Sequence, residues 1–192
     1  MSDSETVLTT RLVHMLQASP DVMAVLRGVR SAGLPDWLMF SGAVYQTVWN
    51  ARSGRPCGFG LRDYDIAYFD ADTSVDAELA MVARVRAVLP PRLQPAVEIA
   101  NQARVHLWFE AQFGRPYPPL ASTDAGLLRS LATAHAVGVR LETDGTIFVA
   151  APFGLQDVFD LVMRPNPRLG RLSAFTEKAA DAQQRWPDVR IL

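Results

Sequence analysis

Apolar residues recur along the chain with two different spacings, which predict its helices and strands. Spacings of three and four residues predict helices, and Gly and Pro residues mark where several of them begin or end. The predicted helices are 5–17, 20–31, 43–52, 74–88, 102–113, 123–134, 155–163 and 173–185. These segments alternate with shorter apolar runs through the first two thirds of the chain, so both element types contribute to the core.

The shorter runs predict strands. Residues 37–40 form an apolar run, 63–69 alternate charged and apolar residues, and 96–100 hold one acid among apolar residues. Residues 139–151 predict a hairpin, because Asp144-Gly145 joins two alternating runs. The order predicts an α+β fold with an α/β-like core, in which helices cover a small sheet.

The composition predicts a packed globular chain. Hydrophobic residues make up 49% and charged residues 20% of the 192 residues, which fits one domain. We expect residues 1–33 to form N-terminal helices, 36–113 a core, and 114–192 a C-terminal hairpin and helices.

Charge and apolar run length limit the partners. The formal net charge is −1, whereas binding to long nucleic acid needs a strongly basic face, so no such partner is expected. No apolar run reaches the roughly 20 residues of a membrane span, and the first ten residues lack a signal core. We therefore expect a cytoplasmic protein without a membrane partner. The single cysteine, Cys57, excludes an intrachain disulfide.

Three carboxylates are candidates for a metal site. Asp63 and Asp65 are two residues apart on a predicted strand, so their side chains leave the same face. Glu98 stands alone between apolar neighbours, where a charge is costly unless it is paired or bound to metal. Hard oxygen ligands of this kind suit Mg²⁺ or Mn²⁺. An Asp-x-Asp pair also occurs on ordinary polar strand faces, and Glu98 also suits an ion pair with Arg62 or Arg104.

The turn after residue 40 is a candidate phosphate site. Ser41-Gly42 joins a predicted buried strand to a helix, whose first N–H groups favour an anion. Arg62 and Arg104 are candidates for contact with phosphates, because guanidinium groups bind them in a bidentate manner. Ser-Gly is also an ordinary turn, and Arg104 equally suits a structural role.

The order of these features resembles the DNA polymerase beta-type nucleotidyltransferase superfamily, marked by a Gly-Ser turn, an Asp-x-Asp strand and a later acidic strand. More closely, the chain resembles a bacterial nucleotidyltransferase-like family of unknown function. The segments that carry this resemblance are SGAVYQTVWN, DYDIAYFD, VEIANQARVHLWF, APFGLQDVFDL and RPNP. The resemblance implies the small mixed sheet of that fold, with Asp63 and Asp65 as the metal pair, Glu98 as the third carboxylate and Gly42 as the turn glycine.

Two departures from the superfamily pattern bear on activity. Ala43 stands where the superfamily usually has Ser, and the stretch from Gly42 to Asp63 is longer than usual. The first hypothesis is a Mg²⁺- or Mn²⁺-dependent enzyme that moves a nucleoside monophosphate from an NTP to a hydroxyl of an unidentified acceptor. A small molecule, a protein side chain and a nucleic-acid end are all open as acceptors, and the neutral overall charge favours the first two. The alternative is a catalytically inactive nucleotide- or partner-binding module that retains the fold. A phosphohydrolase that uses the same metals is a weaker third hypothesis.

Overall fold

The computed structural model describes residues 4–170 and 172–192. The helices are α1 (Glu5–Gln17), α2 (Pro20–Ala32), α3 (Gly42–Arg52), α4 (Val75–Val88), α5 (Val105–Phe113), α6 (Thr123–Leu127), α7 (Gln156–Phe159) and α8 (Ser173–Arg185). The strands are β1 (Trp37–Phe40), β2 (Tyr64–Tyr68), β3 (Val97–Asn101), β4 (Gly138–Leu141), β5 (Ile147–Ala150), β6 (Val162–Met163) and β7 (Arg190–Ile191). This is the predicted α+β fold.

A five-stranded sheet organises the chain, in the order β3-β2-β1-β4-β5. Strands β2 and β3 are parallel, and every other neighbouring pair in this sheet is antiparallel, so the sheet is mixed, as predicted. The predicted hairpin is β4–β5, whose turn is closed by a hydrogen bond from the Glu142 N–H to the Thr146 carbonyl, 2.8 Å long. Strands β6 and β7 form a separate parallel pair.

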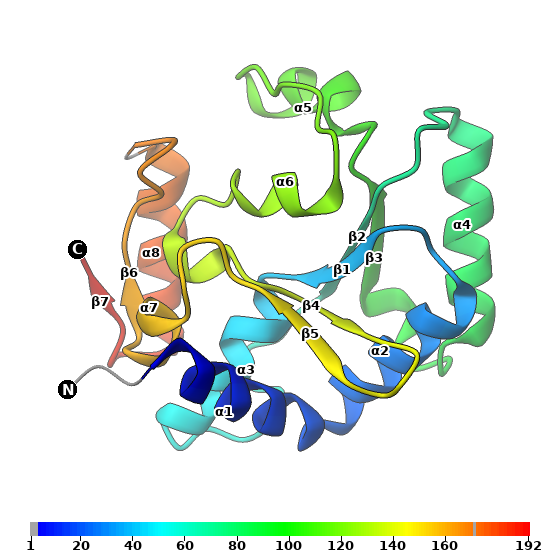
Figure 1. Cartoon of the computed structure of the whole chain (residues 1–192). Coiled ribbons are helices and arrows are strands. Elements are labelled where there is room, and N and C mark those ends of the chain that lie inside the picture. The colour runs from blue at the N-terminus through cyan, green and yellow to red at the C-terminus, as the bar shows by residue number, and fades with distance from the viewer. Residues whose placement is uncertain (1–3, 171) are drawn as a thin grey trace.

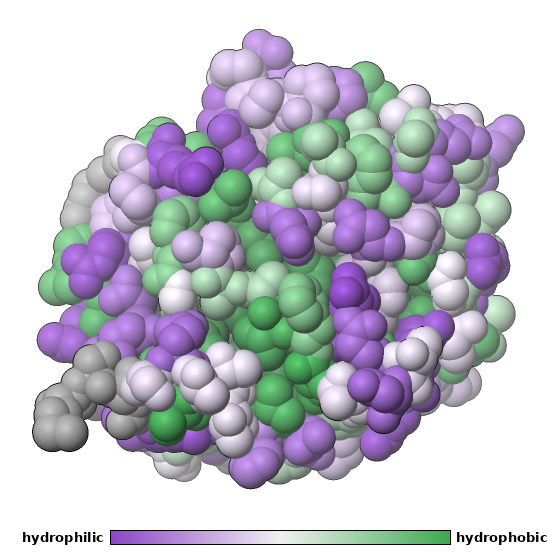
Figure 2. All heavy atoms as spheres, in the orientation of Figure 1, coloured by the Kyte–Doolittle hydropathy of each residue, from purple (hydrophilic) through white to green (hydrophobic). Residues whose placement is uncertain are grey.

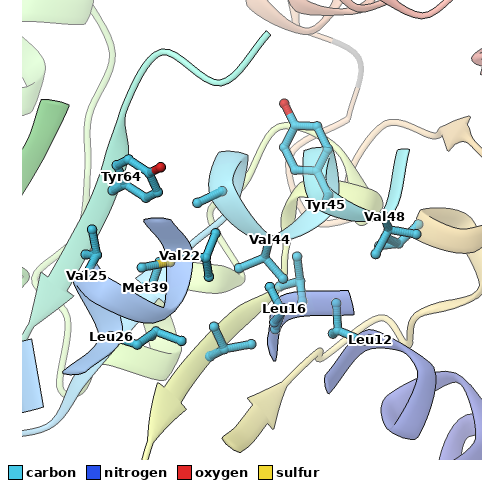
Figure 3. Packing of buried hydrophobic residues seen from close by; sticks show 14 of the residues in the cluster. Leu12, Leu16, Val22, Val25, Leu26, Met39, Val44, Tyr45, Val48 and Tyr64 are labelled. Atoms are coloured by element: carbon cyan, nitrogen blue, oxygen red, sulfur yellow. The ribbon is translucent and has the colours of Figure 1, made fainter. Parts of the chain in front are cut away.

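The core lies between the sheet and the helices α1, α2 and α3 (Figure 1). Leucine and valine side chains from these three helices meet Met39 of β1 and Tyr64 of β2 (Figure 3). Burial of such side chains stabilises the fold by roughly 1.5–3 kcal/mol each. In the same orientation, hydrophobic side chains gather near the centre of the molecular face, and hydrophilic ones occupy much of its periphery (Figure 2).

Capping residues in the sequence predicted the ends of several helices correctly. Helix α2 begins at Pro20 and ends before Gly33, which adopts the left-handed conformation at φ 67° that glycine accepts without strain. Helix α4 begins after Ser74, whose side-chain oxygen accepts a hydrogen bond from the Ala77 N–H. Helix α4 buries little of its own surface, since Val85 is its buried residue and Leu79 is 59% exposed.

Two predicted helices are wrong in length. The helix predicted over 123–134 ends at Leu127, because the chain beyond it turns to meet a distant segment. The buried Asn166 side chain donates hydrogen bonds to the Leu128 and Ser130 carbonyls at 2.9 and 2.7 Å, which occupies these acceptors. The helix predicted over 155–163 shortens to α7, and its last residues pair as β6 instead. Among the described residues, no helix is long and apolar enough to cross a membrane.

Candidate active site

The turn between β1 and α3 has a constrained backbone. Ser41 adopts φ 50° and ψ −104°, and its N–H donates to the Val137 carbonyl at 2.8 Å. Helix α3 starts at Gly42, and a Cβ added there would lie 3.8 Å from Oδ1 of Asp63. The N-terminal end of this helix therefore lies close to the Asp63 carboxylate. The Ser41-Gly42 turn therefore lies next to the acidic pair, as a phosphate and metal site would need.

The sheet register places two of the three carboxylates side by side. Asp65 lies on β2 and Glu98 on β3, and their Cα atoms are partners in the parallel pair. Asp63 directly precedes β2, on the same side as Asp65. Burial, followed by the negative charges of Asp63 and Glu98, raises the pKa of Asp65 to about 6. The structure thus brings the three predicted carboxylates into one neighbourhood.

The environment of Glu98 differs from the one expected. The sequence indicated a charge enclosed by apolar residues, but β3 is an edge strand and the Glu98 side chain is exposed. Its two candidate ion-pair partners are engaged elsewhere: Arg104 Nε lies 2.9 Å from Glu78, and Arg62 Nη2 lies 3.3 Å from Asp181. Glu98 is therefore available to solvent or to a ligand.

The donor set fits a hard divalent cation. The three carboxylates supply oxygen ligands, and a bound cation would oppose the rise in the pKa of Asp65 that burial and, after it, the charges of Asp63 and Glu98 cause. Within the described residues, no three acidic, histidine or cysteine side chains are already gathered closely enough to hold an ion. The metal site is therefore a prediction.

Two cavities meet at the carboxylates. The larger has a volume of about 560 Å³ and the smaller about 320 Å³. Ser41 and Asp65 line both of them. Glu98 lines the larger cavity, whereas Asp63 and Gly42 line the smaller one. A ligand in either cavity would therefore reach the Asp65 carboxylate.

The smaller cavity contains three basic side chains. Arg62 is the one that the sequence analysis proposed, and Lys178 and Arg185 from α8 were missed. Arg62 and Arg185 both pair with Asp181, while Lys178 is exposed. No local motif marks α8 as part of a site, because it lies more than a hundred residues from Asp63 and Asp65 along the chain.

Two buried polar side chains also line the smaller cavity. Oε1 of Gln46 and Nε2 of His135 are buried without a hydrogen-bond partner among the described residues. Gln46 lies one helical turn after Gly42, so the i, i+4 spacing was a signal that the sequence analysis did not use. The ring of His135 stacks on Tyr45, with the ring centres 4.6 Å apart.

His135 is held neutral by its surroundings. Burial, followed by the positive charges of Lys178 and Arg185, lowers its pKa to about 3. A neutral imidazole has one nitrogen that donates and one that accepts a hydrogen bond. The smaller cavity therefore offers cations and uncharged hydrogen-bonding groups together.

The larger cavity has a different lining, with aromatic side chains from the segment that includes α5. Phe109, Tyr117 and Trp108 line it, and Trp108 is 38% exposed rather than buried in the core. Two arginines, Arg115 and Arg129, line the same cavity. The sequence analysis did not propose these arginines as site residues.

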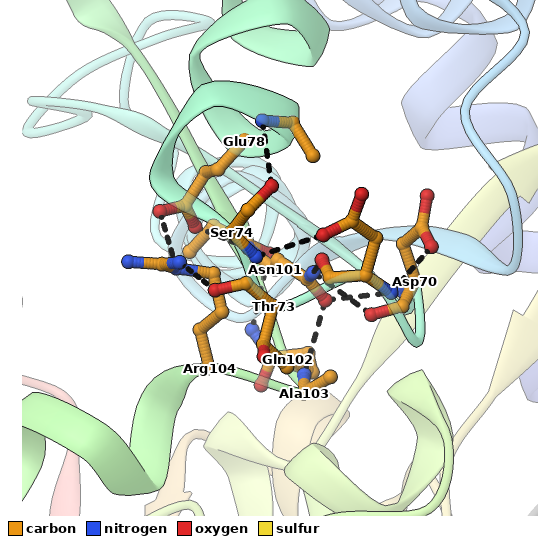
Figure 4. Close-up of polar contacts among 11 residues, drawn as sticks. Asp70, Thr73, Ser74, Glu78, Asn101, Gln102, Ala103 and Arg104 are labelled. Carbon is orange, nitrogen blue, oxygen red and sulfur yellow. Dashed lines mark hydrogen bonds and ion pairs between the residues drawn. The ribbon is translucent and has the colours of Figure 1, made fainter.

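Arg104 lies outside both cavities. Besides its ion pair with Glu78, its guanidinium donates to the Thr73 carbonyl (Figure 4). Asn101 extends the same network, because its N–H donates to Glu78 Oε1 at 2.9 Å and its side chain donates to the Asp70 carbonyl at 2.9 Å. The geometry gives Arg104 a structural role at the ends of β2 and β3 and does not support the predicted phosphate contact.

A family model described as nucleotidyltransferase matches residues 27–191. The chain belongs to this nucleotidyltransferase family. The match spans the whole sheet, both cavities and all three carboxylates. The resemblance drawn from the sequence is therefore confirmed at the level of the family. No curated protein matches the chain.

Solved structures share the fold of this nucleotidyltransferase. An NMR structure described as a CCA-adding enzyme head domain is 24% identical, with a TM-score of 0.77 and 95% of each chain covered. A CCA-adding enzyme in complex with CTP is 18% identical, with a TM-score of 0.58 over 96% of this chain and 43% of that one. An apo CCA-adding enzyme is 17% identical, with a TM-score of 0.56 over 93% and 42%. The chain spans less than half the length of the latter two proteins.

Proposed function

We propose that this nucleotidyltransferase moves a nucleoside monophosphate from an NTP to the hydroxyl of an acceptor, with Mg²⁺ or Mn²⁺ as cofactor. The observation that carries the proposal is the position of Asp65, which lines both cavities at the point where they meet. Two ligands bound side by side would then have their reacting groups beside the same carboxylate, which favours direct transfer between them.

The smaller cavity is the proposed donor site. The Ser41-Gly42 turn and the first N–H groups of α3 favour the β- and γ-phosphates, as helix N-termini do. Arg62 and Lys178 add positive charge that complements a triphosphate. The fold neighbour described as a complex with CTP supports a nucleoside triphosphate as the class of donor.

The larger cavity is the proposed acceptor site, because Glu98 lines it beside Asp65. Asp63 and Asp65 would hold the metal, and Glu98 would complete one of its ligand sets. A bound divalent metal supplies charge neutralisation and lowers the pKa of a coordinated hydroxyl. Glu98 would also receive the proton of the acceptor hydroxyl.

The bond changes are those of a displacement at phosphorus. The acceptor oxygen forms a bond to the α-phosphorus, and the bond from the α-phosphorus to the oxygen bridging to the β-phosphate breaks. Pyrophosphate leaves with that electron pair, close to the cations of the smaller cavity. The reaction needs no oxidant or reductant.

Ala43 favours a second candidate function. It stands where the superfamily usually has Ser, and its side chain is buried, so it offers no hydroxyl to a phosphate. An inactive module would bind nucleotide or a partner without transferring anything. Ser41 argues for the active enzyme, because it lines both cavities and carries a hydroxyl at the same turn.

Calorimetric titration with Mg²⁺ and a non-hydrolysable NTP tests the donor site. The wild type is compared with the double variant Asp63→Asn/Asp65→Asn, and the exposed Asp188→Asn serves as a matched control. Metal-dependent nucleotide binding that is lost only in the double variant is the expected result. If the folded wild type binds no nucleotide with metal present, the proposed function is wrong.

A transfer assay then separates the candidate activities. Labelled NTPs are incubated with candidate acceptors, and the products are resolved. A labelled acceptor identifies the transferase, release of phosphate or of nucleoside monophosphate without an adduct identifies the phosphohydrolase, and nucleotide binding without turnover identifies the inactive module.

A further inference from the structure

One wall of the larger cavity is a row of four neighbouring side chains. The guanidinium of Arg115 lies 5.1 Å from the ring centre of Phe109, and the rings of Phe109 and Tyr117 are 4.5 Å apart. The guanidinium of Arg129 lies 5.1 Å from the ring centre of Tyr117. All four side chains line the cavity, in the order Arg115, Phe109, Tyr117, Arg129. We call this set the cation–aromatic wall.

The two arginines of this wall lack acidic partners. Among the described residues, neither forms an ion pair with a carboxylate, whereas Arg62, Arg104 and Arg185 all do. Nε of Arg129 is also buried without a hydrogen-bond partner in the described part of the chain. Partly buried guanidinium groups in this condition gain most from an anion that accepts their N–H groups in a bidentate manner.

The remaining lining suits a planar ring. Trp108, Ile99 and Val105 supply apolar surface, and Gln102 and Ser130 supply hydrogen-bonding groups. A ring placed against such side chains gains from stacking and from burial. The cavity volume of about 560 Å³ lies within the range of roughly 300–1,000 Å³ common for small-molecule sites.

The distribution of charge restricts the acceptor further. A polycationic acceptor would meet two unneutralised guanidinium groups, and a neutral apolar acceptor would leave both unpaired. The net charge of −1 for the whole chain gives little long-range attraction for a long polyanion, which favours a small molecule.

We infer that the larger cavity binds a small acceptor that carries a planar ring and an anionic phosphate or carboxylate group in addition to its hydroxyl. The cation–aromatic wall holds the ring and the anion. The acceptor hydroxyl lies toward Asp65 and Glu98, which line the same cavity. The assignment of this ligand as the acceptor rests on the proposed function, whereas its binding does not.

Binding of adenosine 5′-monophosphate, measured by calorimetry without metal, tests this inference. Adenosine probes the ring alone and inorganic phosphate the anion alone. We expect both to bind at least about tenfold more weakly than the monophosphate, because a hydrogen bond to a charged group contributes roughly a factor of ten or more. Equal affinity for adenosine and its monophosphate, or no binding of the monophosphate at millimolar concentration, would overturn the inference.

Variants of the two cavities show which of them binds the monophosphate. Arg129→Gln and Arg115→Gln each remove one charge from the wall and are expected to weaken monophosphate binding about tenfold. Two such substitutions keep the test usable if one of them impairs folding, which thermal melting reports. Lys178→Gln removes a charge from the smaller cavity and is expected to leave the affinity unchanged. If only Lys178→Gln weakens binding, the monophosphate occupies the smaller cavity and the inference is wrong.

The double variant Asp63→Asn/Asp65→Asn separates this inference from the proposed function. It is expected to lose metal-dependent NTP binding and to retain monophosphate binding. If the wild type shows no metal-dependent NTP binding, the result counts against the proposed function alone. If the wild type binds NTP but does not prefer the monophosphate to adenosine, the result counts against the acceptor class alone.

Discussion

His135 makes the stability of the protein depend on acid in a way that can be isolated. Its imidazole is buried, stacks on Tyr45, and has its pKa lowered from 6.5 to about 3. Burial is the main cause, and the charges of Lys178 and Arg185 add to it. The perturbation is acidification of the wild type and of His135→Phe, which keeps an aromatic ring next to Tyr45 and removes the titration.

The sign of the pH effect on stability follows from the protonation of His135 in the unfolded and folded states. Below pH 6.5 the unfolded chain binds a proton at this histidine, whereas the folded protein does not until the pH approaches 3. The free energy of unfolding of the wild type therefore falls as the pH is lowered between these values, by about 1.4 kcal/mol per pH unit from this group. At pH 4.5 the loss from His135 is about 2.5 kcal/mol, which is a large part of the stability of a typical domain.

Asp65 acts in the opposite direction over part of this range. Its pKa is raised to about 6, so the folded state gains stability from its protonation as the pH falls from 6 toward 3.8. The two effects offset each other in the wild type. The informative quantity is therefore the difference in the free energy of unfolding between the wild type and the variant at each pH.

Urea unfolding followed by circular dichroism, with a metal chelator present, measures this difference from pH 7.5 to 4.5. We expect the variant to gain about 2.5 kcal/mol on the wild type between pH 6.5 and 4.5. His14→Gln, a change on helix α1, is the control for loss of a histidine that lines neither cavity. A difference that stays constant across the range would refute the assignment of a lowered pKa to His135.

Three further substitutions test the site and its frame. Asp65→Asn is expected to stabilise the metal-free protein at pH 7 by about 2 kcal/mol, with no gain near pH 4, because it removes a carboxylate whose ionisation is disfavoured in the folded state; urea unfolding at both pH values checks this. Gly42→Ala adds a methyl group at the turn of the smaller cavity, so calorimetry is expected to show weaker NTP binding while the melting temperature is retained. Gly60→Ala is expected to cost more than 2 kcal/mol in thermal melts, because φ is +71° and the new Cβ would lie 2.9 Å from Trp186. Gly58→Ala, at φ +79° with no atom beyond its chain neighbours within 4 Å of the added Cβ, is its control and should lose only the backbone component of about 1–2 kcal/mol.

Local chemistry explains why most of the fold was predictable from the sequence. Pro20 and Gly33 bound α2, and Asp144-Gly145 lies in the turn of the β4–β5 hairpin, because each residue type favours a backbone conformation whatever surrounds it. Apolar periodicity predicted α1 over its full length. Predictions failed where a distant segment intervened, as when Asn166 hydrogen-bonds the backbone after α6.

The candidate site shows the same contrast between what local sequence and what tertiary packing determine. The sequence alone determined which carboxylates share a face and which turn precedes a helix, because these depend on spacings of a few residues within one element. Only the tertiary structure decided that β3 lies at the edge of the sheet and exposes Glu98, since strand order is a property of the assembled sheet.

The same holds for the groups that surround the carboxylates. Lys178 lies on α8 and Arg129 beyond α6, and neither belongs to a motif that spacing alone reveals. The packing of α8 against the core, with Phe175 fully buried, brings Lys178 to the smaller cavity. The sequence therefore indicated the candidate carboxylates and the local backbone that presents them. The tertiary structure decided which charges and rings face them, because those contacts exist only after segments far apart in the chain have packed together.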